Sequence, residues 1–442
     1  MVLVNIGKQK LFLLLFLLGF QEAKSQVWTL QQCIDTANVY NKNLQVSRNN
    51  VSLGEQKEKE LKAGLIPKVM ANADYRYYTN LPYQLMPLSA FGGPEGEYRA
   101  IQFGVPNLIN ANLQFSMALY NPHVYGSIQS SKLGSELLEL QYRKTEEQIY
   151  FEISNLYYNA QILQHQLTFI DSNLINSEIM LEKMVLLNKQ LLAKESDVSK
   201  VKLQVAQNTT LRENFGSKYD QVLNMLKFAM GIQLEQNLKI DPTIQYQKKS
   251  EYTQNSTLDI RIVEIQNRLL SNELITLNRS KNLPSLNLVG TYGTTGFGYN
   301  GLPTSFLDFY TIGFAGLQLS QPLFNGTVTQ RKINQKKIEL QNSELQFGLF
   351  TEQNSMLSEN AMLQGAIAQN SIETTRKQVE LAKTIYKQTI LQQELETASL
   401  TDVLLADNAL REAQQNYLSA IIDYLKSDLE IKKLTGNIST TK

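Results

Sequence analysis

Mostly apolar residues recur at alternating steps of four and three along one long segment of the chain. The positions are Ile149, Ile153, Leu156, Ala160, Leu163, Leu167, Ile170, Leu174, Ser177, Leu181, Met184, Asn188 and Leu191. A heptad pattern of this length predicts a long helix that packs against other helices, as in a coiled coil. Residues 126–192 would form a helix about 100 Å long at about 1.5 Å per residue.

The same spacing returns near the C-terminus. It runs through Val403, Ala406, Leu410, Ala413, Tyr417, Ala420, Tyr424, Ser427, Ile431 and Leu434. Small and large residues alternate in this series, which allows neighbouring helices to approach closely. The helical pattern alone is also compatible with an alternative, a free-standing dimeric coiled coil.

Four short segments alternate with a period of two, which is typical of strands. Their apolar positions are Val69, Ala71, Ala73, Tyr75 and Tyr77, then Ala111, Leu113, Phe115, Met117 and Leu119, then Leu286 and Leu288, then Ala315, Leu317 and Leu319. Each segment has about ten residues, the length of a tilted strand that crosses a bilayer. An apolar face toward lipid and a polar face toward water fit a membrane barrel. The alternative is a small soluble hairpin or the edge of a β-sandwich.

Four strands are too few to close a barrel, because about eight are needed before the interior can be filled. Open sheet edges are not tolerated in lipid. The sequence therefore predicts that several copies of the chain share one barrel.

An internal duplication organises the chain. The triplets 119–121 and 323–325 end similar strand-like runs, Ser196-Asp197-Val198 matches Thr401-Asp402-Val403, and Gly231 matches Gly436. All three pairs are offset by about 205 residues, as expected of two copies of one unit. Pro67 and Pro284 are further apart, which places extra residues of the first copy in the polar segment 78–107.

These patterns predict a chain of nine segments. They are a signal peptide (1–25), an N-terminal helix (26–67), a strand pair with a surface loop (68–123), a long helical hairpin (124–231), a linker (232–256), a further helix (257–284), a second strand pair (285–324), a second long helical hairpin (325–436) and a tail (437–442).

The N-terminus predicts export from the cytoplasm. Lys8 and Lys10 precede the apolar run 11–20, and Ala23-Lys24-Ser25 supplies the small residues of a cleavage site. This arrangement is typical of a secretory signal peptide, with the mature chain starting near Gln26. Gln31 and Gln32 before Cys33 do not form a lipobox, so no lipid anchor is expected.

Composition narrows the function further. The chain has 42 basic and 41 acidic residues, which argues against a nucleic-acid partner. One cysteine excludes an intramolecular disulfide, and His123 and His165 are too few for a typical zinc site. No catalytic motif is found, and Glu146-Glu147 is interpreted as a solvated helix face. We therefore expect no enzyme activity, no catalytic residue, no metal and no cofactor.

Several motifs carry a family resemblance. They are the helix start Trp28-Thr29-Leu30 with Thr29 as N-cap, the Pro67 and Pro284 positions before strands, Gln321-Pro322-Leu323-Phe324-Asn325-Gly326, and Thr401-Asp402-Val403-Leu404 with the run to Gly436. In order and spacing the chain resembles the TolC-like outer-membrane efflux proteins over nearly all of its mature length.

The resemblance implies a fold that is mainly α-helical with a small transmembrane β part. Duplicated helical hairpins would form an α-barrel, and four strands per chain would contribute to a twelve-stranded barrel in a homotrimer. It implies a passive outer-membrane channel of a Gram-negative cell that projects into the periplasm. Such channels serve tripartite efflux or type I secretion, and their partners are a periplasmic adaptor and an energy-supplying inner-membrane transporter.

The resemblance also implies a periplasmic tip where the helical hairpins turn. The tip and adaptor-docking positions are Leu191, Leu192, Asp197, Leu395 and Glu396. Family members often have glycine at the positions of Leu191 and Glu396, and a second constriction aspartate at the position of Leu405.

Asp402 matches the first constriction aspartate of the family. In a trimer it would form a ring of three carboxylates that favours cations and raises some of their pKa values. The alternative is that Asp402 caps the returning helix, and the same alternative is favoured for Asp197.

The sequence leaves two alternatives to the efflux-channel function. A structural coiled-coil protein would be extracted without detergent and would form no pore. A passive porin would need many more strands per chain and no helices of this length.

Overall fold

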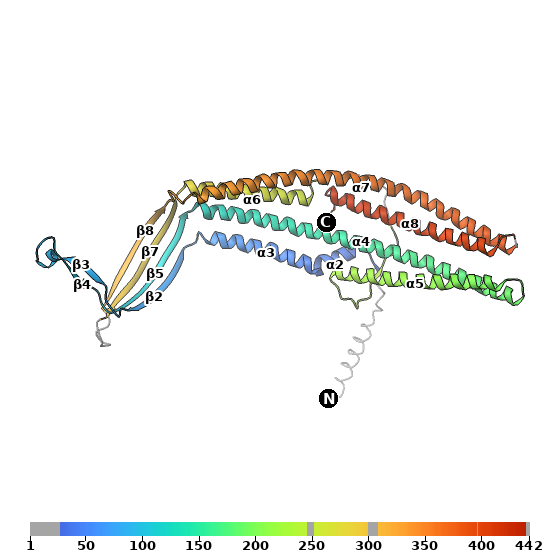
Figure 1. Ribbon diagram of the computed structural model, residues 1–442, viewed down its shortest axis with the longest axis horizontal. Coiled ribbons are helices and arrows are strands. Elements are labelled where there is room, and N and C mark those ends of the chain that lie inside the picture. Colours follow the sequence, from blue (N-terminus) through green and yellow to red (C-terminus); the bar gives the residue numbers. More distant parts are fainter. Residues whose placement is uncertain (1–26, 245–251, 299–307, 396, 439–442) are drawn as a thin grey trace, which may run out of the picture. The chain divides into compact units, whose positions relative to one another are not determined.

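The computed structural model describes residues 27–244, 252–298, 308–395 and 397–438 (Figure 1). The expected signal peptide and Glu396 lie outside these residues, as does part of the linker. The chain divides into two compact units, one of residues 50–139 and 262–347 and the other of the remaining residues. Helices dominate the described chain and one four-stranded sheet accompanies them, as expected of the mainly helical fold class.

The sheet of the first unit is antiparallel and has the order β2-β5-β7-β8 (Figure 1). Its strands are β2 (Lys68–Tyr77), β5 (Asn107–Tyr120), β7 (Ser285–Gly298) and β8 (Asp308–Ser320). Each coincides with one of the four segments of period two. The two strand pairs of the duplication thus meet in one sheet, joined through β5 and β7.

A second, smaller hairpin occupies the polar segment between β2 and β5. Strands β3 (Tyr83–Pro87) and β4 (Tyr98–Gln102) pair antiparallel, and the short helix η1 (Leu88–Phe91) lies between them. The extra residues of the first copy therefore form an ordered hairpin where the sequence predicted only a loop.

The predicted long helical hairpins are present in both copies. The first consists of α4 (Pro122–Lys189) and α5 (Glu195–Met230), and the second of α7 (Val328–Glu394) and α8 (Leu400–Leu434). Helix α6 (Leu258–Asn282) precedes the second strand pair. Among the described residues, no helix is both long and apolar enough to cross a membrane.

The N-terminal helix is interrupted, in contrast to the single helix expected over 26–67. Thr29 caps α2 (Leu30–Tyr40), as predicted, through a capping box with Gln32. The chain then breaks at Asn41 before α3 (Lys42–Ala63). The Asn41 side chain accepts hydrogen bonds from the backbone amides of Asn43 and Leu44, at 2.9 and 3.1 Å, and so caps the second helix.

The linker after α5 packs against this N-terminal segment. Strand β6 (Lys239–Ile240) pairs in parallel with β1 (Val27–Trp28), and both Leu238 and Ile240 are buried. The backbone oxygen of Pro242 lies 2.9 Å from Nε2 of His165, so this histidine of α4 contacts the linker.

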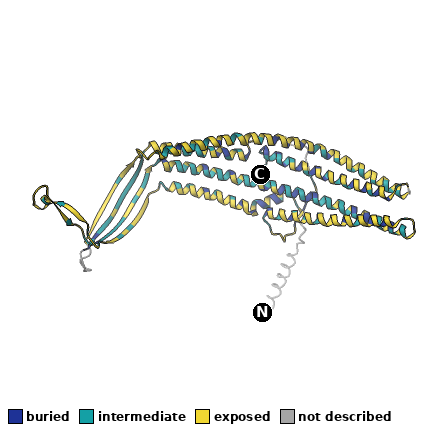
Figure 2. Ribbon diagram, in the orientation of Figure 1, coloured by how far each residue is buried: buried dark blue, intermediate teal, exposed yellow. Residues whose placement is uncertain are grey.

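The unit that does not contain the four-stranded sheet is called the helical unit below. The predicted heptad seams form its core (Figure 2). Ile153 and Ala160 of α4 are fully buried, and Val403, Leu410 and Ile431 of α8 are buried as well. Leu191 is an exception, because it lies in the turn after α4 and its side chain is 93% exposed.

The interpretation of Glu147 as part of a solvated helix face is wrong. Its side chain is half-buried, and burial raises the pKa of the Glu147 carboxyl to about 7. Lys433 and Lys144 oppose this rise in pKa, and Asp259 adds to it.

Replacing Glu147 with glutamine is expected to remove a loss of stability at alkaline pH. Because the folded-state pKa lies above the unfolded value, the folded chain binds the proton more tightly. The contribution of Glu147 to the free energy of unfolding is therefore most favourable below about pH 4.5 and falls as the pH rises to about 7. After a discount for partial exposure, Glu147→Gln should be more stable than the parent by about 1 kcal/mol at pH 8.

Denaturant unfolding at pH 5 and pH 8 measures this difference. Glu152→Gln changes an exposed glutamate of the same helix and is the matched control. Identical pH profiles of stability for the two variants would show that the pH dependence does not come from Glu147.

Candidate functional site

The strand register gives the sheet two chemically different faces, since residues opposite one another share a face. The apolar face carries Val69, Ala71, Ala73, Tyr75, Ala111, Leu113, Phe115, Met117, Leu288, Tyr292, Phe309, Leu317 and Leu319. The polar face carries Asn72, Asp74, Arg76, Asn110, Asn112, Gln114, Ser116, Asn287, Thr291, Thr295, Asp308 and Gln318. The division has exceptions, with Met70, Leu108, Val289, Phe297, Tyr310, Ile312 and Phe314 on the polar face and Asn107, Thr294 and Thr311 on the apolar face.

Side chains on the polar face are linked across three strands. Asn110 Nδ2 of β5 donates to Asp74 Oδ2 of β2 at 3.2 Å, and Thr295 Oγ1 of β7 donates to Asn110 Oδ1 at 3.0 Å. Arg76 forms an ion pair with Asp74 at 2.9 Å. A face of amide, hydroxyl and charged side chains fits contact with water, whereas the opposite, apolar face fits contact with hydrocarbon.

Both edges of this sheet are open. Strands β2 and β8 each pair on one side only among the described residues. A sheet with one apolar face and two unpaired edges cannot enter lipid alone, because each unpaired backbone group would lose its hydrogen bond to water. Completion by other copies of the chain would satisfy these groups.

The two helical hairpins turn at the positions predicted for the tip. The first turn lies between Lys189 and Glu195, and the second between Glu394 and Leu400. Leu191, Leu192 and Leu395 are all strongly exposed there, at 93%, 72% and 74%. These three leucines together give the two turns an exposed apolar surface.

The two turns lie together in the helical unit. Leu400 of the second hairpin packs in one buried cluster with Met184, Val198 and Val201 of the first. Lys183 of α4 also forms an ion pair with Glu394 of α7 at 3.2 Å. The structure thus brings together the predicted tip residues that it describes.

Leu191 adopts the left-handed backbone conformation, with φ at 62°. Glycine is the residue best suited to this conformation. The non-glycine residue leaves backbone strain in the turn.

Leu191→Gly is expected to stabilise the helical unit by about 1 kcal/mol, because it removes this strain. Thermal unfolding followed by circular dichroism measures the change. Leu192→Gly is the matched control, since Leu192 does not have a positive φ. A stabilisation of equal size in both variants would show that side-chain exposure, not strain, is responsible.

Asp402 takes part in a capping box at the start of α8. Its carboxylate accepts hydrogen bonds from the backbone N–H of Ser399 at 2.9 Å and from the Ser399 hydroxyl at 2.7 Å. These bonds hold the pKa of Asp402 below its usual value. In the single chain Ser399 is the N-cap residue and Asp402 is its capping-box partner, so Asp402 contributes to capping without being the N-cap itself. The side chain is exposed and remains available to a neighbouring chain.

The capping alternative is wrong for Asp197. Helix α5 begins after Lys194, which makes no side-chain cap bond, and Asp197 lies in the first turn of the helix. Its carboxylate forms an ion pair with Lys200 at 3.2 Å instead. Its negative charge still stabilises the positive end of the helix dipole.

The duplicated sequence landmarks have specific structural roles. Asn121 caps α4 by accepting a hydrogen bond from the His123 amide at 3.0 Å. Gly231 and Gly436 both have positive φ, at 75° and 66°, where α5 and α8 end. These residues mark helix boundaries in each copy, which explains their common spacing.

A buried polar network joins the two hairpins, and it was not among the sequence predictions. Asp407 of α8 accepts a hydrogen bond from Gln204 of α5 at 3.1 Å and forms an ion pair with Arg411 at 3.2 Å. Arg411 in turn donates to Asn208 of α5 at 2.6 Å. Polar residues at core spacing were the available signal. Within the described ranges, no cluster of three or more potential metal-binding side chains occurs.

Known proteins match the chain in sequence and in fold. Residues 258–437 match the family described as outer membrane efflux protein. The outer membrane protein TolC of Vibrio cholerae is 22% identical over 352 residues, which cover 75% of this chain and 78% of that protein.

Solved structures extend the likeness to nearly the whole chain. The outer membrane protein VceC of Vibrio cholerae has a TM-score of 0.72 at 15% identity, covering 92% of this chain and 96% of its own. The outer membrane channel CmeC of Campylobacter jejuni has a TM-score of 0.76 at 14% identity, with 93% and 87% covered. The open-state outer membrane channel MtrE of Neisseria gonorrhoeae has a TM-score of 0.73 at 16% identity, with 92% and 88% covered.

The sequence comparison and the structural comparison point to the same resemblance. The resemblance to the TolC-like outer-membrane efflux protein family is confirmed, by sequence over residues 258–437 and by fold over nearly the whole chain.

Proposed function

We propose that this chain is the outer-membrane channel subunit of an efflux or type I secretion system. Three copies complete a twelve-stranded barrel in the outer membrane, and their long helices form a conduit that projects into the periplasm. The observation that carries this proposal is the four-stranded sheet, with one apolar face, one polar face and two open edges.

The channel is passive in this proposal, and it performs no chemistry on its cargo. A periplasmic adaptor docks at the tip, where Leu191, Leu192 and Leu395 expose apolar surface. An inner-membrane transporter supplies the energy through that adaptor. The sequence relative TolC and the structural neighbours CmeC and MtrE are outer membrane proteins or channels by name.

Conductance across a planar lipid bilayer tests the proposal. The detergent-purified full chain should insert and give stepwise increases in current. A protein that remains in solution without detergent and never conducts would overturn the channel function. It would instead support the structural coiled-coil alternative.

The same measurement tests Asp402 as a constriction residue. Asp402→Asn keeps an acceptor oxygen for the Ser399 amide but removes the negative charge. We expect the variant to lose part of the cation preference, measured as a shift in reversal potential under a salt gradient.

Asp197→Asn is the matched control, because the Asp197 charge is paired with Lys200. An unchanged reversal potential in Asp402→Asn would limit the role of Asp402 to helix capping. A shift of the same size in both variants would assign selectivity to the general charge of the tip.

A further inference from the structure

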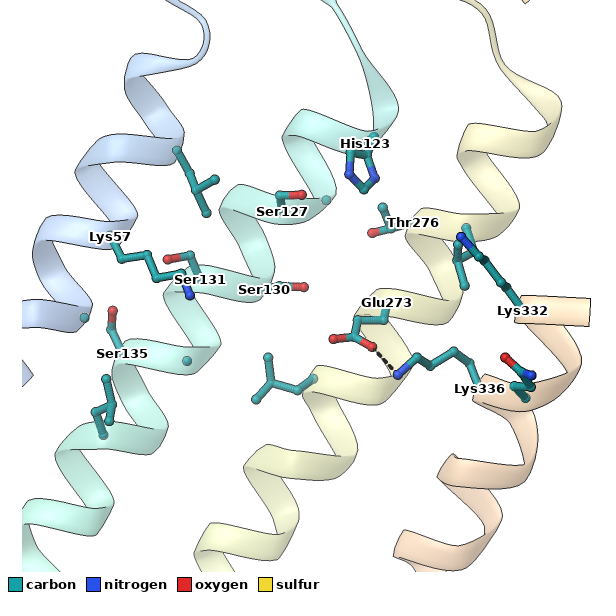
Figure 3. Close-up of a pocket in the computed structure, with 18 residues that line it drawn as sticks. Lys57, His123, Ser127, Ser130, Ser131, Ser135, Glu273, Thr276, Lys332 and Lys336 are labelled. Carbon is teal, nitrogen blue, oxygen red and sulfur yellow. Dashed lines mark ion pairs between the residues drawn. The ribbon is translucent and has the colours of Figure 1, made fainter. Parts of the chain in front are cut away.

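An open cavity of about 750 Å³ lies among the helices that adjoin the sheet. Its lining comes from four helices of one unit, namely α3, α4, α6 and α7 (Figure 3). The labelled side chains of all four helices face the same space in that view. The volume is within the range of small-molecule sites in proteins.

Small residues on α4 create the floor of this cavity. They are Gly126, Ser127, Ser130, Ser131, Gly134 and Ser135. A Cβ at Gly126 would overlap Thr276 of α6, so the two helices touch at this point. A Cβ at Gly134, by contrast, would meet no heavy atom within 4 Å, so that residue faces open space.

Positive charge dominates the rim. Lys57 of α3 and Lys332 and Lys336 of α7 line the cavity, and Glu273 of α6 is the one acidic residue of the lining. Glu273 is already paired with Lys336 at 2.8 Å. Lys57 and Lys332 form no ion pair with any carboxylate among the described residues. Two ammonium groups on opposite sides of the cavity are therefore free to bind an anion.

The polar groups of the floor are only partly used within the chain. Ser130 Oγ accepts a hydrogen bond from Asn272 at 2.9 Å, and Thr276 donates its hydroxyl proton to the backbone oxygen of Asn272. The hydroxyl of Ser135 is buried and has no hydrogen-bond partner in the part of the chain that the structure describes. This hydroxyl is a further unused hydrogen-bond donor of the lining.

Apolar side chains complete the lining. Leu61, Leu138, Leu269 and Leu277 contribute to the wall. A wholly hydrophilic anion would leave these leucines in contact with water, and a neutral apolar molecule would leave the lysines unpaired. The lining therefore matches a molecule that has both an apolar body and an anionic group.

We propose that this cavity binds an amphiphilic organic anion, with its anionic group at Lys57 or Lys332 and its apolar body against the leucines. Binding itself does not require the proposed channel function. The interpretation of the bound anion as a solute in transit does rest on that function.

Calorimetric titration of the detergent-purified full chain with naphthalene-1-sulfonate tests the site. The uncharged analogue naphthalene-1-sulfonamide has nearly the same shape, and we expect it to bind about tenfold more weakly. The double variant Lys57→Gln/Lys332→Gln should weaken sulfonate binding by a similar factor. Lys59→Gln/Lys337→Gln changes two lysines of the same helices outside the lining and should leave binding unchanged.

Gly134→Leu supplies an independent test that does not depend on charge. Its side chain would fill the cavity, and replacement of a helical glycine should not harm folding. We expect this variant to lose measurable sulfonate binding. Full affinity in Gly134→Leu, or equal affinity for sulfonate and sulfonamide, would overturn the site.

A second titration with dihexanoyl phosphatidylglycerol distinguishes the source of the anion. Lysine-dependent binding of the sulfonate supports a site for soluble anions, and lysine-dependent binding of the lipid alone supports a site for headgroups. Wild-type conductance is measured separately. A conducting protein without binding would refute only the site, and a binding protein without conductance would refute only the channel.

Discussion

Gly231→Ala is expected to destabilise the helical unit by at least about 3 kcal/mol. Gly231 ends α5 with φ at 75°, and its amide and that of Ile232 donate to the last carbonyl groups of the helix, Phe228 and Lys227, at 3.0 and 3.1 Å. A methyl group at this position would overlap the backbone carbonyl oxygen of Tyr40. Alanine would therefore meet both an unfavourable backbone conformation and a steric clash.

Thermal unfolding monitored by circular dichroism measures this effect. Gly216→Ala is the control, because Gly216 lies inside α5 and a Cβ there meets nothing within 4 Å. Alanine at that position should stabilise the helix by up to about 1 kcal/mol. Gly436→Ala should have an intermediate cost, since its Cβ would lie 3.2 Å from that of Asn255. A Gly231 variant as stable as the Gly216 variant would contradict the packing of α2 against α5.

Asp407→Ala is expected to cost about 3 kcal/mol of unfolding free energy. Asp407 is only 7% exposed, and it accepts bonds from Gln204 and Arg411. Removing the carboxylate leaves a largely buried guanidinium without its counter-ion. Two apolar replacements, Asp407→Leu with Arg411→Met, should recover much of the loss, because neither charge then remains buried.

Chemical denaturation of the purified chain compares this variant with an exposed pair. Asp171 of α4 pairs with Arg212 of α5 at 2.6 Å, but its side chain is 47% exposed. Asp171→Ala should cost less than about 1 kcal/mol. Equal losses in the two single variants would show that the buried network contributes no more than a surface ion pair.

The sequence predicted the elements of the fold because their patterns are local. A period of two identified all four strands of the sheet, and a period of three and four identified both long hairpins. The register of β5 against β7 was not predictable, since it joins two copies that lie far apart in the chain. The β3–β4 hairpin was missed because its short strands lie among proline and glycine residues that indicate a loop.

The candidate sites were predictable only where a backbone constraint marks them. The tip turns were expected from the family resemblance, and Leu191 in the first turn adopts the conformation that glycine favours. The lysine-lined cavity has no sequence signature, because its lining comes from four separate helices. The burial of Glu147 was missed for a similar reason, since Lys433 and Asp259, which influence its pKa, come from distant parts of the chain.

Averaged electron-microscopy images of the detergent-extracted protein test the central claim most directly. The account predicts particles with three-fold symmetry, in which three sheets close one barrel and the long helices extend from it as a tube. A soluble rod, or a compact single chain that needs no detergent, would contradict the account.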